Sequence, residues 1–565
     1  MFKPPKLEED VKATLPVIPV KPIYQILDEA VQSAGHKKAM DFLGRSWTYA
    51  ELGDLVDRAA AGFRVQGVKP GTKVGLHLPN SPYYVICYFA ILKAGGTVVN
   101  YNPLYVEREL AYQIKDSGTS IMVTMDLAQL YSKVANLLSK TGLEKLVVCR
   151  MADILPTTKS VLFKLLKRRD RAILPQDSRI IGFEKLIRFG GVEKPAGIDP
   201  KTEIAVLQYT GGTTGVPKGA ILTHGSVSAN VEQLRQWVSM YDHSDARMLC
   251  ALPFFHVFGM TVAMLVGVAL RAELILLPRF EVGQVLKVIT KKRPTLFPGV
   301  PTIYIAINRA MAEYHGKFDL SSIRACVSGG APLPLEVQKE FERLSGGRLV
   351  EGYGLSEASP VVTCNPFDRP GPERSIGLPL PGTQVEFRAL DDPHKHVKAG
   401  EKGEVCVHGP QVMAGYWQRP DATEDVFVGD VLRTGDVGYA DKDGFIYIVD
   451  RIKDLIICSG YKVYPHVIED AIYHHPAVEE VIVVGVPDSY RGQAPKAYVK
   501  LKDGLTLTDE ELKKFLVDHL SRLEMPHEIE FCGALPRTAV GKLSKKALLE
   551  EEAAKAEIMA GRPAA

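Results

Sequence analysis

A segment rich in glycine and threonine carries the clearest chemical signal in the sequence. Residues 209–219 read Tyr-Thr-Gly-Gly-Thr-Thr-Gly-Val-Pro-Lys-Gly and directly follow an apolar run, Ile204–Gln208, that predicts a strand. Glycines let backbone N–H groups turn inward as an anion nest, and hydroxyls and an ammonium group add donors for phosphate oxygens. The segment is not a Walker A loop, because Pro217 precedes the lysine and Gly219 follows it. The candidate phosphate-binding residues are Thr210, Gly211, Gly212, Thr213, Thr214, Gly215 and Lys218, of which Thr213 is also a candidate catalytic residue.

Two further glycine-bearing loops follow predicted strands. Ser328–Pro332 comes after the strand Arg324–Val327, and Gly352–Glu357 comes after Leu349–Glu351. In open α/β sheets, ligands bind where loops leave the carboxyl ends of the strands. The three loops therefore predict one shared crevice.

The larger part of the chain has an α/β pattern. Short apolar runs alternate with helical patterns from about Lys73 onward, which is typical of largely parallel sheets. Short β-like pieces with turn signals follow from Asp391 to Tyr447 and predict a mainly β subdomain. Residues 1–450 are thus expected to form a large domain of two parallel-rich α/β subdomains plus a β subdomain. Its other predicted strands include Lys73–Leu78, Ser120–Thr124 and Lys145–Cys149.

A charged stretch, Asp450–Asp454, marks the predicted domain boundary and hinge. The residues after it, 451–565, predict a small α/β C-terminal domain. Its expected elements are strands at Val481–Val486 and Ala497–Leu501, and a helix near Asp509–Leu520 that begins with a capping box of Thr508 and Glu511.

Length and composition limit the class of protein. A chain of 565 residues is too long for one core, and 46% hydrophobic with 24% charged residues is typical of a soluble globular protein. The net charge of +3 gives no basis for nucleic-acid binding, which requires a strongly basic face. The eight cysteines are scattered without a CxxC pair, which favours free thiols in a reducing compartment and argues against a zinc site.

Two segments are considered for contact with a membrane. The uncharged stretch Ala251–Leu270 is long enough to span a bilayer, but its proline and glycines favour a buried helix, and the N-terminus lacks a signal-peptide apolar region. We therefore predict a cytoplasmic protein. Lys159–Arg171 combines five apolar and six basic residues, a pattern that can lie on an anionic bilayer. A surface helix packed on its own domain is the preferred interpretation, so at most peripheral contact with the inner face of the membrane is expected.

Residues 209–219 resemble the phosphate loop of the adenylate-forming superfamily, which comprises acyl-CoA synthetases, luciferases and the adenylation domains of peptide synthetases. The resemblance extends from about Tyr24 to Leu548 and implies a C-terminal domain that rotates between two half-reactions about a hinge at Lys453. The other motifs follow in the family's order: Leu252–Gly259 (LPFFHVFG), Ser328–Pro332 (SGGAP), Gly352–Glu357 (GYGLSE), Leu432–Asp436 (LRTGD), Asp450–Pro465 (DRIKDLIICSGYKVYP) and Pro536–Lys542 (PRTAVGK).

The resemblance also assigns roles around the nucleotide. Glu357, helped by Thr210, would hold Mg²⁺ beside the phosphates, which suits a carboxylate next to a triphosphate. Tyr353, Gly354 and the backbone of Gly330-Ala331 would bind the adenine, since a flat ring and close-approaching glycines suit that contact.

Further roles concern the sugar, the acid and the thiol. Asp436 and Arg451 would reach the ribose hydroxyls, because a carboxylate can accept from both hydroxyls of a sugar. Lys542 would bridge the substrate carboxylate and the α-phosphate in the transition state. His256 would place the acid at the mouth of an acyl pocket, and the Gly460 loop would serve thioester formation.

Within the superfamily, the likeness is closest to bacterial long-chain fatty-acid–CoA ligases. It implies ATP, Mg²⁺ and coenzyme A as cofactors and a fatty acid as the substrate. Two departures from the family pattern remove no proposed catalytic group: Val428–Val431 stands where a Gly-Trp pair is usual, and Ser356 replaces a commoner threonine. The strings that carry the likeness are Leu207–Gly212 (LQYTGG), Asn100–Tyr105 (NYNPLY) and Gly415–Pro420 (GYWQRP).

Several alternatives remain open on sequence alone. They are a medium-chain or aryl acid:CoA ligase, an acyl-AMP ligase that loads a carrier protein, a light-emitting relative, and a non-catalytic acyl- or nucleotide-binding protein. The missing insertion near the hinge disfavours the carrier-loading enzyme. The sequence does not decide between a monomer and a homodimer. The non-catalytic protein is disfavoured by the complete set Thr210, Glu357, Asp436, Lys453 and Lys542.

Overall fold

The computed structural model describes residues 17–188, 197–210, 217–239, 244–314, 316–459, 461–488, 491–537 and 543–559, without the side chains of 556–559. They form two compact units, a larger one of residues 17–384 and 407–432 and a smaller one of 385–406 and 433–559. Seven of the site residues expected from the sequence lie outside the described residues: Gly211, Gly212, Thr213, Thr214, Gly215, Gly460 and Lys542.

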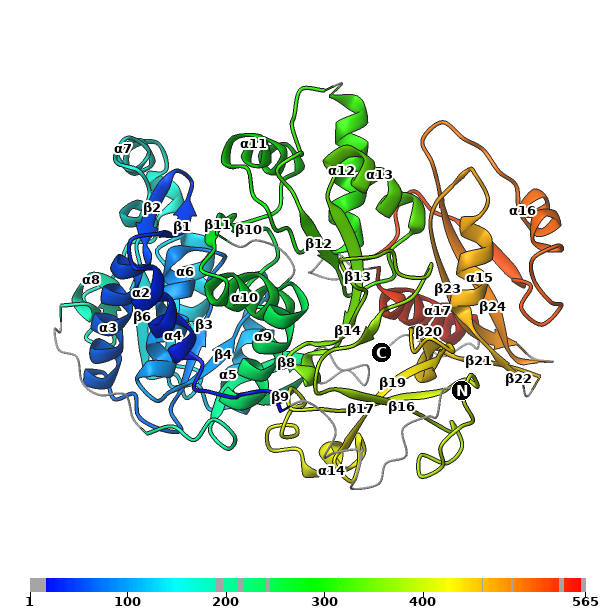
Figure 1. Ribbon diagram of the computed structural model, residues 1–565, viewed down its shortest axis with the longest axis horizontal. Helices are drawn as coiled ribbons and strands as arrows, with labels where there is room; N and C mark the ends of the chain where they lie inside the picture. Colours follow the sequence, from blue (N-terminus) through cyan, green and yellow to red (C-terminus); the bar gives the residue numbers. More distant parts are fainter. Residues whose placement is uncertain are drawn as a thin grey trace. The chain divides into compact units, whose positions relative to one another are not determined.

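Figure 1 labels the α-helices of both units, while the short η helices carry no label there. In the larger unit they are α2 (Tyr24–Ala34), α3 (Tyr49–Val65), α4 (Pro82–Lys93), α5 (Glu107–Ser117), α6 (Ala128–Ala135), η1 (Met151–Ile154), α7 (Thr157–Leu166), η2 (Arg168–Asp170), α8 (Phe183–Leu186), α9 (His224–Trp237), η3 (Gly259–Leu265), α10 (Val266–Ala269), α11 (Val282–Lys292), α12 (Pro301–Glu313), α13 (Leu335–Ser345), η4 (Ser356–Ala358) and α14 (Pro420–Glu424). In the smaller unit they are η5 (Ile452–Asp454), α15 (Pro465–Tyr473), α16 (Asp509–Leu516) and α17 (Lys545–Met559).

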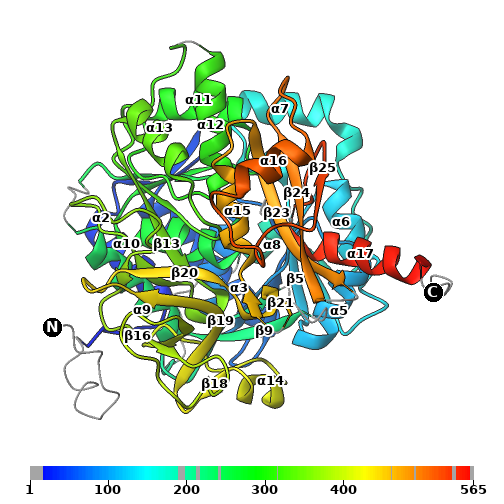
Figure 2. The same cartoon turned by 90° about the vertical axis from the view of Figure 1, so that its right-hand side faces the viewer.

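The smaller unit contains a five-stranded sheet whose two faces are covered by different helices. Successive side chains of a strand point to opposite faces. Val481 and Val483 therefore pack with α15 and α16, whereas Ile482 and Val484 pack with Leu548 of α17 (Figure 2). The strands run in the order β22-β21-β24-β23, with β25 paired to β24: β21 (Ile456–Cys458), β22 (Tyr461–Val463), β23 (Val478–Asp488), β24 (Gly492–Leu501) and β25 (Glu528–Phe531).

The predicted capping box at α16 is present. The Thr508 hydroxyl accepts from the Glu511 N–H, and the Glu511 carboxylate accepts from the Thr508 N–H. The helix ends at Leu516, four residues before the predicted end at Leu520, and a turn follows in which the N–H groups of His519 and Leu520 both donate to the Leu516 carbonyl.

The mainly β segment that the sequence predicted is confirmed as a second five-stranded sheet. The boundary between the two units passes through its strands β17 and β19. The order is β16-β17-β19-β18, with β20 paired to β19, and the strands are β16 (Gln384–Arg388), β17 (Gly403–His408), β18 (Phe427–Val428), β19 (Val431–Ala440) and β20 (Ile446–Arg451).

A seven-stranded sheet forms one half of the larger unit. All its strand pairs are parallel except the last, β8 with β9. Val98 packs with α4 on one face while Val99 packs with Leu110 of α5 on the other, so helices cover both faces, as a parallel sheet requires. The order is β7-β6-β5-β3-β4-β8-β9, with β3 (Lys73–Leu76), β4 (Thr97–Asn100), β5 (Ile121–Met125), β6 (Lys145–Cys149), β7 (Ile180–Gly182), β8 (Ile204–Thr210) and β9 (Lys218–Thr223).

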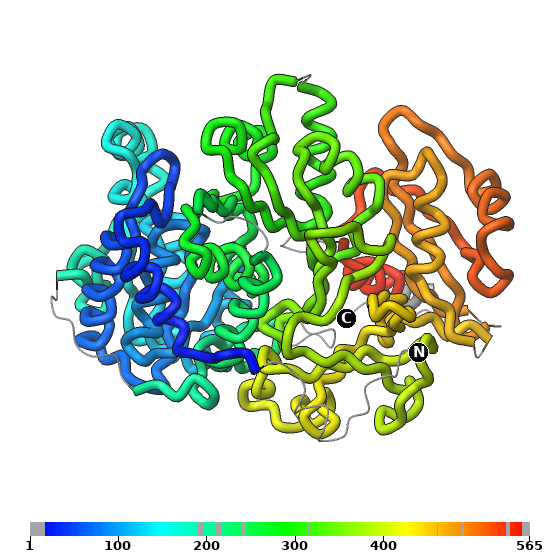
Figure 3. The backbone as a smooth tube through the Cα atoms, viewed as in Figure 1, coloured from blue at the N-terminus to red at the C-terminus, as the bar shows by residue number. Residues whose placement is uncertain are grey.

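The other half joins strands from distant parts of the chain. Strand β1 pairs in parallel with β11, so a blue stretch of the tube in Figure 3 lies beside a green one. Leu296 bridges Met248 and Ala325, which connects this group to β12. The strands are β1 (Lys38–Phe42), β2 (Arg45–Thr48), β10 (Arg247–Cys250), β11 (Glu273–Leu276), β12 (Ala325–Ser328), β13 (Arg348–Gly354), β14 (Val361–Cys364) and β15 (Leu378–Pro379).

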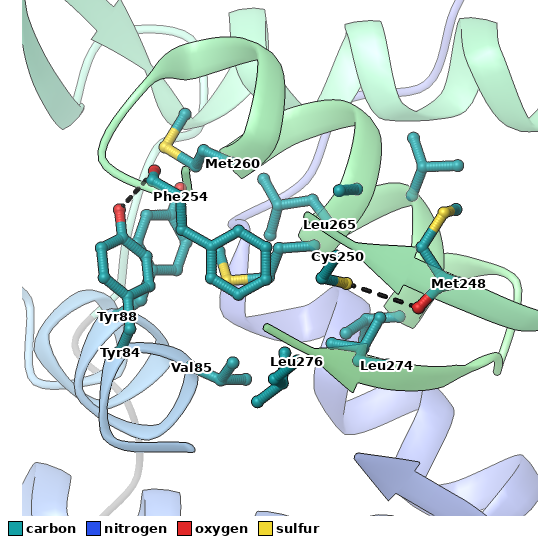
Figure 4. Close-up of a cluster of buried hydrophobic side chains, with 14 of the residues drawn as sticks. Tyr84, Val85, Tyr88, Met248, Cys250, Phe254, Met260, Leu265, Leu274 and Leu276 are labelled. Carbon is teal, nitrogen blue, oxygen red and sulfur yellow. Dashed lines mark hydrogen bonds between the residues drawn. The ribbon is translucent and has the colours of Figure 1, made fainter. Parts of the chain in front are cut away.

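The predicted buried helix within Ala251–Leu270 is confirmed. It consists of the π-helix η3 followed by α10, and every residue of both is buried. Figure 4 shows Phe254, Met260 and Leu265 packed among side chains of α4 and β11. Among the described residues, no helix is long and apolar enough to cross a membrane. All eight cysteines are free thiols, and seven of them are buried.

Candidate functional site

The ends of the glycine-rich loop are fixed by a β-hairpin. Strand β8 continues to Thr210 and β9 begins at Lys218, and these two residues lie directly opposite each other in the antiparallel register. The sequence placed the start of the loop at Tyr209. The strand is longer because β9 supplies hydrogen-bonding partners for its last residues. Thr210 and Lys218 therefore stand side by side where the loop leaves the sheet.

A tyrosine connects this hairpin to Glu357. Glu357 lies in η4, directly after β13, and its Oε1 accepts a hydrogen bond of 2.7 Å from the Tyr416 hydroxyl. The Lys218 ammonium lies 5.3 Å from the centre of the same Tyr416 ring. Burial and the neighbouring carboxylate raise the pKa of Tyr416, so its phenol stays protonated and donates to Glu357. The predicted metal ligand and the predicted phosphate lysine are thus neighbours of one aromatic ring.

Tyr416 belongs to an extended segment that runs along β9. The Ile221 N–H donates to the Gly415 carbonyl at 2.9 Å, and the Trp417 N–H donates to the Gly219 carbonyl at 2.8 Å. Successive side chains of an extended chain point in opposite directions. Tyr416 therefore faces Glu357, while Trp417 faces the other way and lies under the Lys73 ammonium, 4.3 Å from its ring centre.

The loop after β12 packs closely against the segment that carries His256. A Cβ added to Gly329 would lie 3.2 Å from both the Gly352 carbonyl oxygen and the Phe258 ring. The next residue, Gly330, has a φ of +83°, a conformation that glycine adopts without strain. Ala331 is partly buried. The second and third predicted loops are therefore adjacent.

Tyr353 and Gly354 were predicted to lie in the loop Gly352–Glu357, but the structure places both in strand β13. Tyr353 pairs with Thr363 of β14, a strand whose partnership with β13 has no local sequence signal. A Cβ added to Gly354 would lie 1.9 Å from the Pro360 carbonyl oxygen, so only glycine fits there. This close approach holds the turn that presents Glu357.

His256 lies in the turn before η3 and is partly buried. Its Nδ1 accepts from the Phe258 N–H at 3.3 Å, which leaves the proton of the neutral ring on Nε2. The Phe255 carbonyl accepts from the Gln208 side chain of β8 at 3.1 Å. This bond ties the histidine segment to the strand that carries Thr210.

The predicted ribose and hinge residues lie together in the smaller unit. Asp436 and Arg451 are opposite each other in the β19–β20 pair, and the Arg451 Nε lies 3.1 Å from the Asp436 carboxylate. Lys453 follows in η5, and its pKa is lowered by burial and then by the nearby Arg451. The side chain of Asp436 is almost fully buried, so its charge is held by this arginine.

The described residues contain no group of three His, Cys, Asp or Glu side chains that could hold a metal ion. Mg²⁺ does not need such a group, since it is usually bound by one or two carboxylates together with substrate phosphates and water. Glu357 beside the phosphate-loop residues fits this kind of site. Tyr416 was not assigned to the site around Glu357 from the sequence. The tyrosine does lie in the string GYWQRP, which is one of the strings that carry the family resemblance.

Comparison with known proteins shows the family to which the chain belongs. Residues 27–417 match the AMP-binding enzyme family, and residues 467–542 match the AMP-binding enzyme C-terminal domain. The long-chain-fatty-acid–CoA ligase of Bacillus subtilis is 42% identical over 96% of both chains, and that of Escherichia coli O157:H7 is 37% identical over 95% of both. The ATP-bound crystal structure of MatB from Rhodopseudomonas palustris superposes with a TM-score of 0.81 at 28% identity, over 94% of this chain and 99% of that one. The chain therefore belongs to the family of AMP-binding enzymes.

Proposed function

We propose that this protein is an AMP-forming long-chain fatty acid:CoA ligase. In the first half-reaction the fatty carboxylate attacks the α-phosphorus of ATP, and pyrophosphate leaves. In the second, the thiolate of coenzyme A attacks the carbonyl of the acyl-adenylate, and AMP leaves. The single observation that supports the acid and the acceptor is the identity of 42% to a long-chain ligase over nearly the whole chain.

The geometry of the larger unit supports the first half-reaction. Thr210 and Lys218 would bind phosphate oxygens at the loop mouth, and Glu357 with Thr210 would hold Mg²⁺. The ion would supply positive charge that offsets the charge of the triphosphate and the incoming carboxylate. His256 would position the acid, and Tyr353 and the backbone of Gly330-Ala331 would bind the adenine.

The smaller unit would serve both half-reactions. Asp436 and Arg451 would contact the ribose. We place the hinge at residues 450–454, so that residues 451–565 rotate as the mobile domain, with Lys542 presented for adenylation and the Gly460 loop for thioester formation. Hinges of this kind absorb a large backbone change at a few residues between rigid elements.

A panel of acids tests this proposal. Purified protein is assayed for AMP release with ATP and Mg²⁺, with and without coenzyme A, on saturated acids from butyric to stearic and on several aromatic acids. We expect coenzyme A-dependent AMP release that is greatest with the long-chain acids. Preference for a medium-chain or aromatic acid would replace the proposed substrate, and the absence of coenzyme A-dependent release with every acid would refute the ligase.

The contact between Tyr416 and Glu357 leads to a prediction on metal affinity. Tyr416→Phe keeps the ring but removes the hydrogen bond that orients the carboxylate. Losing such a partner typically weakens metal binding about 10- to 100-fold. We therefore expect the Mg²⁺ concentration for half-maximal AMP formation to rise by about that factor.

A matched control is Tyr447→Phe, which removes a tyrosine–carboxylate bond to Asp441 at 3.0 Å outside the site. It should leave the Mg²⁺ titration unchanged. Equal titrations for Tyr416→Phe and the wild type would show that Tyr416 does not orient a metal ligand.

We also propose that α7 brings the enzyme to anionic membranes, where its substrate partitions. The helix is attached through Phe163, which packs on the core, and none of its residues is buried. Its other apolar side chains are largely exposed, Leu165 by 71% and Leu166 by 72%. Six basic residues surround them between Lys159 and Arg171. Exposed leucines among cations are complementary to a bilayer of anionic lipids.

Charge reversal tests this contact. Each basic residue near an anionic surface contributes about 1 kcal/mol. We therefore expect the triple change Lys164→Glu, Lys167→Glu and Arg168→Glu to lower co-sedimentation with phosphatidylglycerol vesicles on the order of a hundredfold or more. Reversal of three exposed lysines elsewhere on the unit, Lys287, Lys291 and Lys339, is the control. Co-sedimentation that is unaffected by the α7 changes would exclude this surface.

A further inference from the structure

A buried carboxylate next to the glycine-rich loop has no role in the reaction described above. Asp116 lies at the C-terminal end of α5, and its side chain is 8% exposed. A negative charge at this end of a helix opposes the helix dipole, so Asp116 does not stabilise its own helix. Apart from a long contact with the Tyr112 hydroxyl of the same helix, its side-chain contacts described below are with other parts of the chain.

The first contact of Asp116 fixes the strand that enters the loop. The Tyr209 hydroxyl donates to Asp116 Oδ2 at 2.6 Å, and Tyr209 directly precedes Thr210. A hydrogen bond to a charged acceptor is short and strong, and its energy depends on the carboxylate staying ionised and in place.

The second contact holds the carboxylate. The Arg419 guanidinium lies 2.5 Å from Asp116 Oδ1, and the Trp417 indole N–H donates to the Asp116 backbone carbonyl at 3.1 Å. Both residues belong to the segment that also carries Tyr416. The segment 415–419, which turns at Gln418, thus contacts Glu357 through Tyr416 and Asp116 through Trp417 and Arg419.

The third contact reaches the strand that leaves the loop. The Tyr112 hydroxyl donates to the Pro217 carbonyl at 3.1 Å and accepts from Arg419 at 3.4 Å. Pro217 directly precedes Lys218. The same acid–arginine pair therefore connects to the residue before Thr210 and to the residue before Lys218.

We propose that Asp116 and Arg419 form a positioning network that sets the spacing of Thr210 and Lys218 for the triphosphate of ATP. The contacts given above include no residue assigned to the acid or to the thiol acceptor, so we expect the network to act on ATP binding. This inference rests on the proposed adenylation reaction and adds to it two positioning residues and their connection to the segment 415–419.

Asp116→Asn tests the proposal with a side chain of the same shape. The asparagine oxygen can still accept from Tyr209, but the charge that holds Arg419 is lost. Small displacements of binding groups cost up to about a hundredfold in rate. We expect kcat/KM for ATP to fall on the order of tenfold to a hundredfold, mainly through KM for ATP. The KM for the fatty acid, and thioester formation from supplied acyl-AMP, should stay at wild-type values.

Asp41→Asn is the matched control. Asp41 is also a buried carboxylate of the larger unit, paired with Lys292 at 2.6 Å. It lies in β1, and its hydrogen bonds are with Gly44, Ser46 and Lys292, none of which belongs to the glycine-rich loop or its flanking strands. Its loss should lower stability without changing KM for ATP. If Asp116→Asn and Asp41→Asn lower stability alike and both leave KM for ATP unchanged, the network is only structural and the proposal is wrong.

Two further variants keep the test decisive if Asp116→Asn does not fold. Tyr112→Phe keeps the Asp116–Arg419 pair but removes the hydroxyl that contacts Pro217, and with it the longer contacts to Arg419 and Asp116. It should raise KM for ATP about threefold to tenfold, the effect of about one hydrogen bond. Arg419→Gln should match Asp116→Asn, and the double variant should be no worse than either alone, since the pair acts as a unit. If Tyr112→Phe and Arg419→Gln both leave KM for ATP unchanged, the proposed network is wrong. If the wild-type protein itself releases no AMP, the ligase proposal is wrong instead.

Discussion

Lys542→Ala is expected to abolish most of the adenylation activity while leaving the second half-reaction nearly intact. The proposed ammonium bridges the fatty carboxylate and the α-phosphate as negative charge develops in the transition state. Removing one preorganised donor of this kind costs about 10²- to 10³-fold in rate. Formation of acyl-AMP, followed as pyrophosphate release, should fall by that factor. Thioester formation from supplied acyl-AMP and coenzyme A should change less than about threefold, within the variation expected for a surface change.

Lys546→Ala provides the control for this experiment. Lys546 is a nearby exposed lysine, paired only loosely with Glu550 at 3.7 Å, and its loss should affect neither half-reaction. Equal losses of both half-reactions in Lys542→Ala would contradict the assignment, because they would place the lysine in a step that the two reactions share.

Glu357→Gln is expected to lower the adenylation rate by a similar factor. Unlike Lys542→Ala, it should also change how the rate depends on Mg²⁺. The glutamine keeps the shape and can still accept from Tyr416, but it lacks the negative charge that a Mg²⁺ ligand supplies. Adenylation should fall about 10²- to 10³-fold, the effect of losing one preorganised electrostatic group. The rate should also fail to saturate with Mg²⁺ over the range that saturates the wild type.

The comparison with Tyr416→Phe makes this prediction specific. If the tyrosine acts through the carboxylate, the double variant should be no worse than Glu357→Gln alone. Glu342→Gln, which removes a carboxylate that accepts from the Leu349 N–H outside the site, should retain its Mg²⁺ dependence. A Glu357→Gln enzyme with normal activity and normal Mg²⁺ saturation would exclude Glu357 as the metal ligand.

The elements that position the site could largely be predicted from the sequence. Buried parallel strands such as β6 (Lys145–Cys149) read as continuous apolar runs, because both faces are covered. The predicted bounds of β6 agree with the structure, whereas β3 ends two residues earlier than predicted and β5 is shifted by one residue. The ends of β8 and β13 could not be predicted in the same way. Their last residues, Thr210 and Gly354, are extended because β9 and β14 pair with them, and such partners are set by the tertiary fold.

The contacts of the side chains that support the site could not be predicted from the sequence, for a related reason. Tyr416 is 59 residues from Glu357, and Arg419 is 303 residues from Asp116. Single residues at such separations have no periodicity or local spacing that marks them as neighbours. The glycine-rich loop and Glu357, in contrast, lie directly after strands, where the architecture itself predicts a binding crevice.

The central claim is that the oxygen of a fatty carboxylate attacks the α-phosphorus of ATP. Palmitate labelled with oxygen-18 in its carboxylate tests this claim most directly, with AMP and pyrophosphate analysed by mass spectrometry after turnover with coenzyme A. We predict one labelled oxygen in AMP and none in pyrophosphate. Label in pyrophosphate or inorganic phosphate, or unlabelled AMP together with acyl-CoA formation, would contradict the account.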